Sequence, residues 1–523
     1  MLLRPCGFCY DELMRIALAN PPITDFYFTR GRMSGLGALT VKSLLEAAGH
    51  TVAYFDFPGS AGRARTVQLP DELFYLSPFL LAETGPTSFF TGYKRLGGTP
   101  AACANTMLAT RPDAVLISCF AYAYSLDAIA LAEEIRNADP SVPIIVGGAG
   151  ATVHPEGMMR SPAIDIVVAG EAETNLLSFF EGFCRGDADY HTAPNVFLRD
   201  NGAVARTGNP RYTSEDDLSW IYHVGRSSAG SLSVTTSLSR GCPKRCGFCS
   251  SHLCHGKTMR RVSLDLCLRG IDELPDTPSI HLNFEDDNLL HEYGYFYEIC
   301  RRINKRYNQT TLSAQNGIDV SQIDAGLLPE LKHLGFQHLD FSLVSTDEKI
   351  LSSTQRKHLS SSIADICRKA HVIGIETTTY FICGLDYDSD KSTVQNLLFL
   401  HELPTKIGIS LFYAVPGIAG YADPSLFSNS SPRLCCGSSA YPWTGSLTTS
   451  QLITAFRIAR FSNLVKSSPQ TRETHADLIN TTVKKKRLHT WKKTAGRAEV
   501  IEIPNMDNSM VEEFIRGAQA STH

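Results

Sequence analysis

The chain of 523 residues alternates short apolar runs with stretches of helical periodicity, and this alternation limits the folds open to it. In the first third, the apolar runs end in glycine or polar residues. Runs of this length, bounded by turn residues and separated by helical patterns, are typical of parallel strands covered by helices. They lie at 16–19, 51–55, 114–118, 143–146 and 164–168. We therefore expect an α/β fold that begins with a doubly wound parallel sheet of Rossmann type.

The ends of these strands mark the expected ligand edge of the sheet. Ligands of doubly wound sheets bind beyond the carboxyl ends of the strands. Four of these ends fall at Asn20, Ser118, Gly147 and Gly170. Small residues there allow backbone amides to approach a phosphate or a ring system. The sequence therefore predicts a ligand site along this edge.

A second alternating run predicts a partial barrel. Its six apolar runs lie at 232–238, 280–284, 310–314, 338–343, 377–382 and 409–413. Six strand–helix units suggest a partial (β/α)6 barrel with its chemistry at the C-terminal strand ends. The polar segment at 195–229 is interpreted as a linker, and the region after 422 contains one clear helical pattern, at 451–466. The predicted organisation is a sheet domain at 1–194, the linker at 195–229, a barrel at 230–422 and a small, mainly helical region at 423–523.

Composition excludes several classes of protein. Hydrophobic residues make up 43% of the chain and charged residues 20%, which is ordinary for a globular protein. Forty-nine basic against 53 acidic residues give a net charge of −4, so no general attraction to nucleic acid is expected, and the basic stretch at 484–487 is interpreted as a solvated face. Neither a transmembrane run nor a signal-peptide pattern is evident. We expect a cytoplasmic protein.

Three of the fifteen cysteines form a motif. Cys242, Cys246 and Cys249 follow the first predicted barrel strand with C-x3-C-x2-C spacing. Three thiolates this close suit three corners of a four-iron four-sulfur cube, because cysteine thiolates are the usual cluster ligands. Glycines at 241 and 247 allow the backbone to fold tightly around the cluster. A cube with three protein ligands leaves one iron open to a small molecule.

A structural zinc site is the competing interpretation of the motif. Cys254, His252 or His255 would then complete a closed tetrahedral site. Zinc ribbons usually pair two C-x2-C knuckles, and no second knuckle lies at the expected distance. The cluster is therefore favoured.

The triplet resembles the signature loop of the radical S-adenosylmethionine (SAM) superfamily, including the aromatic residue Phe248 before the last cysteine. The resemblance implies that the open iron binds SAM, which is cleaved to a 5′-deoxyadenosyl radical. Val344 and Asp386 depart from the family pattern, where Glu and Pro are common. Later strand ends resemble the family's SAM-binding elements, and the residues carried over for SAM are Phe248, Glu285, Asp286, Asn316, Ser342, Arg356 and Gly384.

The N-terminal domain resembles the cobalamin (B12)-binding domain that precedes the barrel in one class of this superfamily. The residues carried over for cobalamin are Ser118, Gly147, Gly148, Gly170 and Glu171. The Asp-x-His-x-x-Gly motif of that domain is missing, because residues 24–37 contain no histidine. Either cobalamin binds without a protein ligand below the cobalt, or the domain binds none and serves packing. His154 is expected on a helix start or at the surface.

The resemblance implies a radical SAM enzyme, and among these it favours a cobalamin-dependent C-methyltransferase. The alternatives are a cobalamin-independent radical rearrangement or oxidation, and a non-catalytic cobalamin- or metal-binding protein. Expected partners are a small-molecule or lipid-like substrate and a reductant such as flavodoxin or ferredoxin. Tyr413, at the sixth strand end, is the candidate catalytic residue. Four further cysteines could together hold an auxiliary cluster or a zinc ion, but nothing in the sequence places them near each other, so free thiols are favoured; they are Cys6, Cys9, Cys435 and Cys436.

Overall fold

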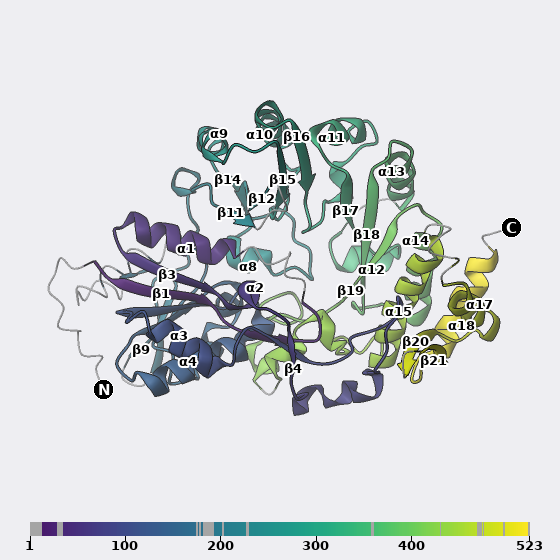
Figure 1. The fold of residues 1–523 in the computed structure, drawn as a ribbon, viewed down its shortest axis with the longest axis horizontal. Coiled ribbons are helices and arrows are strands. Elements are labelled where there is room, and N and C mark those ends of the chain that lie inside the picture. The colour runs from purple at the N-terminus through teal and green to yellow at the C-terminus, as the bar shows by residue number, and fades with distance from the viewer. Residues whose placement is uncertain are drawn as a thin grey trace.

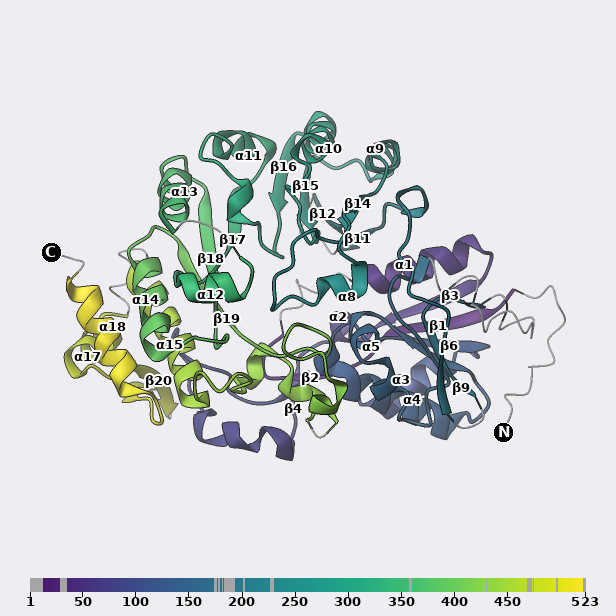
Figure 2. The same ribbon diagram turned by 180° about the vertical axis from the view of Figure 1, so that it is seen from behind.

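The computed structural model joins two α/β units, and a C-terminal region packs against the second of them (Figure 1, Figure 2). Within the part of the chain that the structure describes, no helix is long and apolar enough to cross a membrane. The described residues are 13–28, 35–173, 176, 179, 180, 182, 193–200, 203–225, 230–356, 360–428, 430–467, 473, 475–494 and 497–520.

A seven-stranded sheet forms the N-terminal unit, in the order β10-β9-β8-β7-β6-β1-β3. The five strands from β8 to β3 pair in parallel, and β9 and β10 add an antiparallel hairpin at one edge. The strands are β1 (Arg15–Asn20), β3 (Thr51–Asp56), β6 (Ala114–Ser118), β7 (Ile144–Gly147), β8 (Ile166–Val168), β9 (Val196–Asp200) and β10 (Ala203–Thr207).

Helices cover both faces of this sheet because successive side chains of a strand point to opposite sides. Ala17 and Ala19 of β1 enter one hydrophobic core with α3 and α4, while Ile16 and Leu18 enter a second core with α1. The doubly wound sheet predicted from the sequence is confirmed. The helices are α1 (Leu36–Ala47), α3 (Pro100–Leu108), α4 (Ser125–Ala138), α5 (Ala149–Val153) and α6 (Pro155–Met158), with η3 (Tyr122–Tyr124) before α4.

Between β3 and α3 the chain leaves the N-terminal unit and reaches the C-terminal region. In both views this dark blue segment runs below the barrel toward the last helices (Figure 1, Figure 2). Its β5 pairs antiparallel with both β2 and β4. The elements of this small sheet and its surroundings are β2 (Ile23–Asp25), α2 (Phe57–Ser60), β4 (Arg65–Thr66), η2 (Asp71–Phe79) and β5 (Lys94–Leu96).

The second unit contains all six predicted barrel strands. They form two parallel sheets, which isolated bridges between Leu312 and Phe336 and between Ile318 and Phe341 join at the middle. The strands are β12 (Ser231–Thr236), β15 (Ser279–Phe284), β16 (Gln309–Ser313), β17 (His338–Val344), β18 (Glu376–Cys383) and β19 (Lys406–Leu411). The helices around them are α9 (Leu264–Glu273), α10 (Tyr293–Arg306), η6 (Val320–Gln322), α11 (Leu328–Leu334), α12 (Glu348–Ser353), α13 (Ser360–Val372) and α14 (Asp390–His401).

The segment predicted as a linker belongs instead to both sheets. Its β9–β10 hairpin completes the N-terminal sheet, and β11 (Tyr222–Gly225) pairs antiparallel with β12. The hairpin escaped the sequence pattern because β10 is an edge strand with most of its residues exposed. Edge strands are rich in polar residues, so they lack the apolar run on which strand prediction depends. A short turn, η5 (Glu215–Asp217), lies between the two sheets.

The C-terminal region contains the predicted helix and three further elements. Helix α15 (Thr449–Lys466) begins at a capping box formed by Thr448 and Gln451. The elements that the sequence analysis did not predict are α17 (Ala476–Lys485), the β20 (His489–Thr494) and β21 (Arg497–Glu502) hairpin, and α18 (Asn508–Ala520). Three short turns precede α15, namely η7 (Pro424–Phe427), η8 (Pro432–Leu434) and η9 (Gly437–Ser439).

Candidate cofactor site between the sheet and the barrel

A cavity of about 460 Å³ lies between the carboxyl edge of the N-terminal sheet and the first strands of the barrel. All four strand ends predicted from the sequence line it, as do Gly148 and Glu171. The facing wall comes from the segments that follow β12 and β15. The residues of that wall are Ser237, Ser239, Arg240, Cys254, His255, Glu285 and Asp287.

The cysteine loop leaves the barrel beside this cavity. It follows β13 (Ser239–Arg240), which pairs antiparallel with β14 (Arg260–Arg261), and it leads into α8 (Ser251–His255). Gly241 has φ +81°, and a Cβ there would lie 2.4 Å from the carbonyl oxygen of Thr258. Only glycine fits such a position without displacing backbone. The turn that opens the loop therefore requires this residue.

The three thiols of the loop are electrostatic neighbours. Burial raises the pKa of Cys249 to about 11, and interactions with Asp287, Cys246 and Cys242 add to the shift. Burial also raises the pKa of Cys242. From the far side of the loop, Arg356 Nη1 donates to Cys246 Sγ over 3.5 Å. A cation beside the thiols stabilises their ionised, ligand-binding form.

This donor set fits an iron–sulfur cluster rather than a zinc ion. Among the described residues, no three His, Cys, Asp or Glu side chains converge as ligands of one metal ion. His255, weighed as a fourth zinc ligand, faces Glu171 through Nδ1 at 3.0 Å. Cys254, the other thiol weighed for zinc, is buried, and burial raises its pKa to about 12, which disfavours the thiolate that a metal would bind. The three thiols of the loop suit three corners of a cube with one open iron.

The acidic segment after β15 contributes two kinds of carboxylate. Asp286 is buried, and it accepts hydrogen bonds from the backbone amide of Leu238 at 3.1 Å and from the hydroxyl of Ser239. Burial raises the pKa of Asp286 to about 7. It therefore holds the segment that enters the cysteine loop, whereas Glu285 and Asp287 line the cavity. The Asn316 side chain supports this arrangement by donating to the carbonyl oxygen of Glu285 over 2.9 Å.

The other residues predicted for SAM lie around the same loop or at later strand ends. Arg356 pairs with Asp319 at 3.3 Å as well as contacting Cys246. Phe248 packs against a small apolar cluster that includes Val344. At Gly384, φ is +94°, and the backbone amide donates to the carboxylate of Asp388. Ser342 donates its backbone amide to the carbonyl oxygen of Ile318 at 3.2 Å.

Val344 stands out in its backbone conformation. It is fully buried, has φ +68°, and lies at a bulge in the pairing of β17 with β18. Positive φ is strained for a β-branched residue. The departure from the family pattern that the sequence showed at this position therefore coincides with an irregular strand end.

Tyr413 follows β19 with 42% of its surface exposed. The surrounding protein raises its pKa, and the nearby thiols of Cys436 and Cys249 add to the shift. Tyr413 therefore lies near one thiol of the loop. Cys436 contacts the Ser438 hydroxyl at 3.1 Å, and the neighbouring Cys435 is buried. Cys6 and Cys9 lie outside the described residues.

His154 is the N-cap residue of α6, a helix start as the sequence analysis expected, but it is not at the surface. It is 5% exposed, packs edge-on against Tyr122 and is absent from the lining of the cavity.

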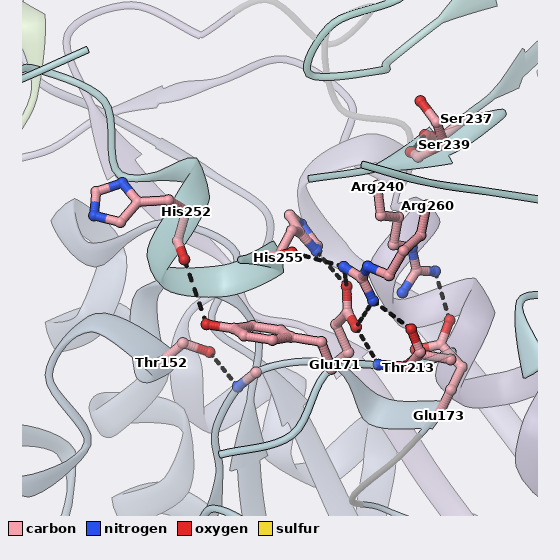
Figure 3. Close-up of polar contacts among 12 residues, drawn as sticks. Thr152, Glu171, Glu173, Thr213, Ser237, Ser239, Arg240, His252, His255 and Arg260 are labelled. Carbon is pink, nitrogen blue, oxygen red and sulfur yellow. Dashed lines mark hydrogen bonds and ion pairs between the residues drawn. The ribbon is translucent and has the colours of Figure 1, made fainter. Parts of the chain in front are cut away.

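A group of polar residues meets at the junction of the two units, and the sequence analysis singled out Glu171 there but missed its partners. Arg260 forms a bidentate ion pair with Glu171, and Arg240 pairs with Glu173 at 2.6 Å (Figure 3). Thr213 donates its backbone amide to the same Glu171 carboxylate at 2.7 Å. Neither arginine carries a local motif, since each meets its partner across the junction. Only their positions near the cysteine loop offered a signal.

Family models identify both units. A model of the B12 binding domain matches residues 95–179, and a model of the radical SAM superfamily matches residues 236–400. This chain joins a B12-binding domain to a radical SAM domain. Both resemblances noted in the sequence are confirmed. A radical SAM domain implies a 4Fe-4S cluster and SAM, and the B12-binding domain supports cobalamin.

Solved structures share this architecture. The radical SAM methyltransferase TsrM from Kitasatospora setae, solved with cobalamin and a [4Fe-4S] cluster, aligns with a TM-score of 0.57 at 15% identity, covering 78% of this chain and 74% of that one. The cobalamin-dependent radical SAM enzyme OxsB aligns with a TM-score of 0.53 at 15% identity, covering 76% and 54%. At these identities the likeness shows the fold.

Two curated relatives align with a smaller share of this chain than these two solved structures do. An uncharacterized methyltransferase of Pyrococcus horikoshii is 23% identical over 285 residues, 53% of this chain and 61% of that protein. The hopanoid C-3 methylase of Methylococcus capsulatus is 23% identical over 333 residues, 60% of this chain and 61% of that protein. The chain thus spans about three-fifths of the length of these relatives.

Proposed function

We propose that this protein is a radical SAM enzyme that methylates a carbon atom of a small-molecule substrate with the help of cobalamin. When bound, the cluster with SAM would supply a 5′-deoxyadenosyl radical, and cobalamin would supply the methyl group. The names of the relatives support this proposal, since the Pyrococcus and Methylococcus proteins are both described as methyl-transferring enzymes.

The observation that carries the proposal is the shared cavity. Its one wall is the ligand edge of the B12-binding sheet, and its other wall is the barrel edge beside the cysteine loop. The strand ends of the first wall would hold the corrin, and the cysteine loop beside the second wall would hold the cluster. Holding reacting groups close together in the right orientation speeds a reaction, because the entropy cost of bringing them together has already been met.

Different residues of the chain would hold the cluster and bind the ligand ammonium. Cys242, Cys246 and Cys249 would hold the cluster, and Arg356 would support the thiolate of Cys246. Glu285 and Asp287 bring carboxylate groups to the cavity, where a ligand ammonium could be bound by charge-assisted hydrogen bonds.

Cobalamin would bind here without a histidine from the expected loop. Of the described residues that line the cavity, His255 is the one histidine, and its Nδ1 faces the Glu171 carboxylate. Residues 24–37 contain no histidine. The strand ends of the sheet would therefore hold cobalamin, with no histidine of the described cavity lining free to serve as its ligand.

Anaerobic reconstitution with iron, sulfide and hydroxocobalamin tests the proposal. We expect stoichiometric cluster and corrin, and both 5′-deoxyadenosine and S-adenosylhomocysteine from SAM in the presence of reduced flavodoxin. A variant with Cys242, Cys246 and Cys249 all replaced by alanine should bind corrin but yield no 5′-deoxyadenosine. SAM cleavage without corrin binding would favour a cobalamin-independent radical reaction. Absence of cleavage by fully loaded protein would favour a non-catalytic binding protein.

A further inference from the structure

The turn after β8 carries two acidic residues across the junction of the two units. Gly170, two residues after the end of β8, has φ +82° and donates its backbone amide to Thr152 Oγ1 at 2.9 Å. Thr152 in turn donates to the carbonyl oxygen of Gly148, so the turns after β7 and β8 are bonded to each other. Glu171 and Glu173 therefore follow a part of the cavity wall that these hydrogen bonds hold in place.

The Glu171 carboxylate is completely engaged by protein donors (Figure 3). Its Oε2 accepts from Arg260 Nη1 and from the amide of Thr213, each at 2.7 Å. Its Oε1 accepts from Arg260 Nη2 at 2.8 Å and faces His255 Nδ1 at 3.0 Å. A carboxylate offers about four acceptor sites. Although Glu171 borders the cavity, it has no site left for a cofactor.

Two of the donors to Glu171 lie in the segment that follows the cysteine loop. Arg260 lies on β14, which pairs with β13 immediately before the loop, and His255 ends α8, which begins soon after Cys249. Arg260 also donates to the carbonyl oxygen of His255 at 2.6 Å, so β14 is bonded to the end of α8. One carboxylate from the B12-binding domain thus holds the segment after the loop directly, and the pairing of β14 with β13 links it to the strand that enters the loop.

Charge and burial make this attachment rigid. The Glu171 side chain is 0% exposed and that of Arg260 is 10% exposed. The hydrogen bonds from His255 and Arg260 outweigh burial and lower the pKa of Glu171 to about 2. Two residues further along, Glu173 pairs with Arg240 on β13 at 2.6 Å, which adds a second link to the same strand pair.

We propose that Glu171 is a positioning residue that sets the separation of cobalamin and the iron–sulfur cluster. It acts through Arg260 and His255 and touches neither cofactor. The inference deepens the proposed function and rests on it, because both cofactors must be bound for their separation to matter. A displacement of about 1 Å between reacting groups can cost about a hundredfold in rate.

The test compares Glu171→Gln with a matched control, Glu215→Gln. Glutamine has the same shape, but its amide turns a donor toward the donors that surround position 171 and breaks the bidentate pair. Glu215 bonds the next residue of β14, Arg261, through the backbone amide at 2.9 Å, and it is half exposed. The control therefore removes a carboxylate from the same strand without opening the buried pair.

The decisive readout is magnetic. In protein loaded with both cofactors, the cobalt(II) and reduced-cluster EPR signals are broadened by their mutual dipolar coupling. We expect E171Q to retain stoichiometric cluster and corrin but to show a wider distribution of coupling. The ratio of methyl-transfer product to 5′-deoxyadenosine should fall by about a hundredfold. E215Q should match the unsubstituted protein in both measurements.

A second variant tests the inference in case E171Q does not fold. Removing both charges in E171Q/R260Q avoids an unpaired buried guanidinium, so it should fold even if E171Q does not, and it should show the same broadened coupling. Unchanged coupling and product ratio in a folded, loaded variant would overturn the inference while leaving the proposed function intact. Unsubstituted protein that binds a cluster but no corrin would contradict both the inference and the proposed function.

Discussion

Replacing Glu83 by glutamine tests how the segment after η2 is attached to the C-terminal region. Glu83 Oε1 lies 2.6 Å from Arg457 Nη2 on α15, and the side chains are 1% and 0% exposed. The substitution keeps the volume but leaves a buried guanidinium without a counter-charge, which costs about 3–5 kcal/mol. At about 2–4 °C per kcal/mol for a cooperative unit of 150–250 residues, the corresponding thermal transition should fall by about 6–20 °C.

Differential scanning calorimetry of three variants separates the ion pair from general damage. E83Q/R457M removes both charges and should recover most of the loss, because the cost lies in the unpaired charge. Glu72→Gln is the matched control, since Glu72 joins the same segment to Arg433 at 2.9 Å with 28% and 22% of the side chains exposed. It should change stability by about 1 kcal/mol or less. Equal transitions for E83Q and E72Q would refute the reasoning.

Three further predictions concern the cofactor site. Cys246→Ala should lower the iron and sulfide content of reconstituted protein sharply, whereas Cys254→Ala should not, because only the former lies in the triplet. Gly148→Ala should lower the thermal transition, since a Cβ at φ +95° would lie 2.7 Å from the Cys119 carbonyl oxygen; Gly37→Ala, with nothing within 4 Å, should not. Burial raises the folded pKa of Asp286 from 3.8 to about 7, so the stability that its protonated form contributes is present at low pH and lost as pH rises through that window. In Asp286→Asn the fall in urea midpoint between about pH 5 and about pH 8 should therefore shrink; an unchanged fall would contradict the assignment.

The strands that the sequence showed most plainly are those with apolar faces on both sides. Parallel strands such as β6 and β7 are buried between two helical layers, so nearly every residue is apolar and the run is visible. Strands β10 and β20 were missed for the opposite reason. β10 is largely exposed, and β20 has five polar or charged residues around a single tryptophan in a two-stranded hairpin, so tertiary contacts rather than composition select their conformation.

Some residues of the candidate site could be predicted from their neighbours in the chain, whereas others depend on contacts with distant segments. Asn20, Ser118, Gly147 and Gly170 could be predicted because a strand end is defined by its own neighbours in the chain, and parallel strands bring such ends to one edge. Arg260 could not, because its partner Glu171 lies 89 residues away in another domain.

Glu171 shows what the strand-end rule leaves undetermined. The rule places this carboxylate at the ligand edge, and the structure does place it in the cavity wall. Whether it binds a cofactor depends on which groups the opposite wall presents, and that wall is built by the barrel. Arg260, His255 and Thr213 occupy the acceptor sites of the Glu171 carboxylate. The carboxylate that the sequence analysis expected to bind cobalamin therefore joins the two domains instead. A residue at a strand end therefore has its place set by its own sheet and its role set by the domain that closes over it.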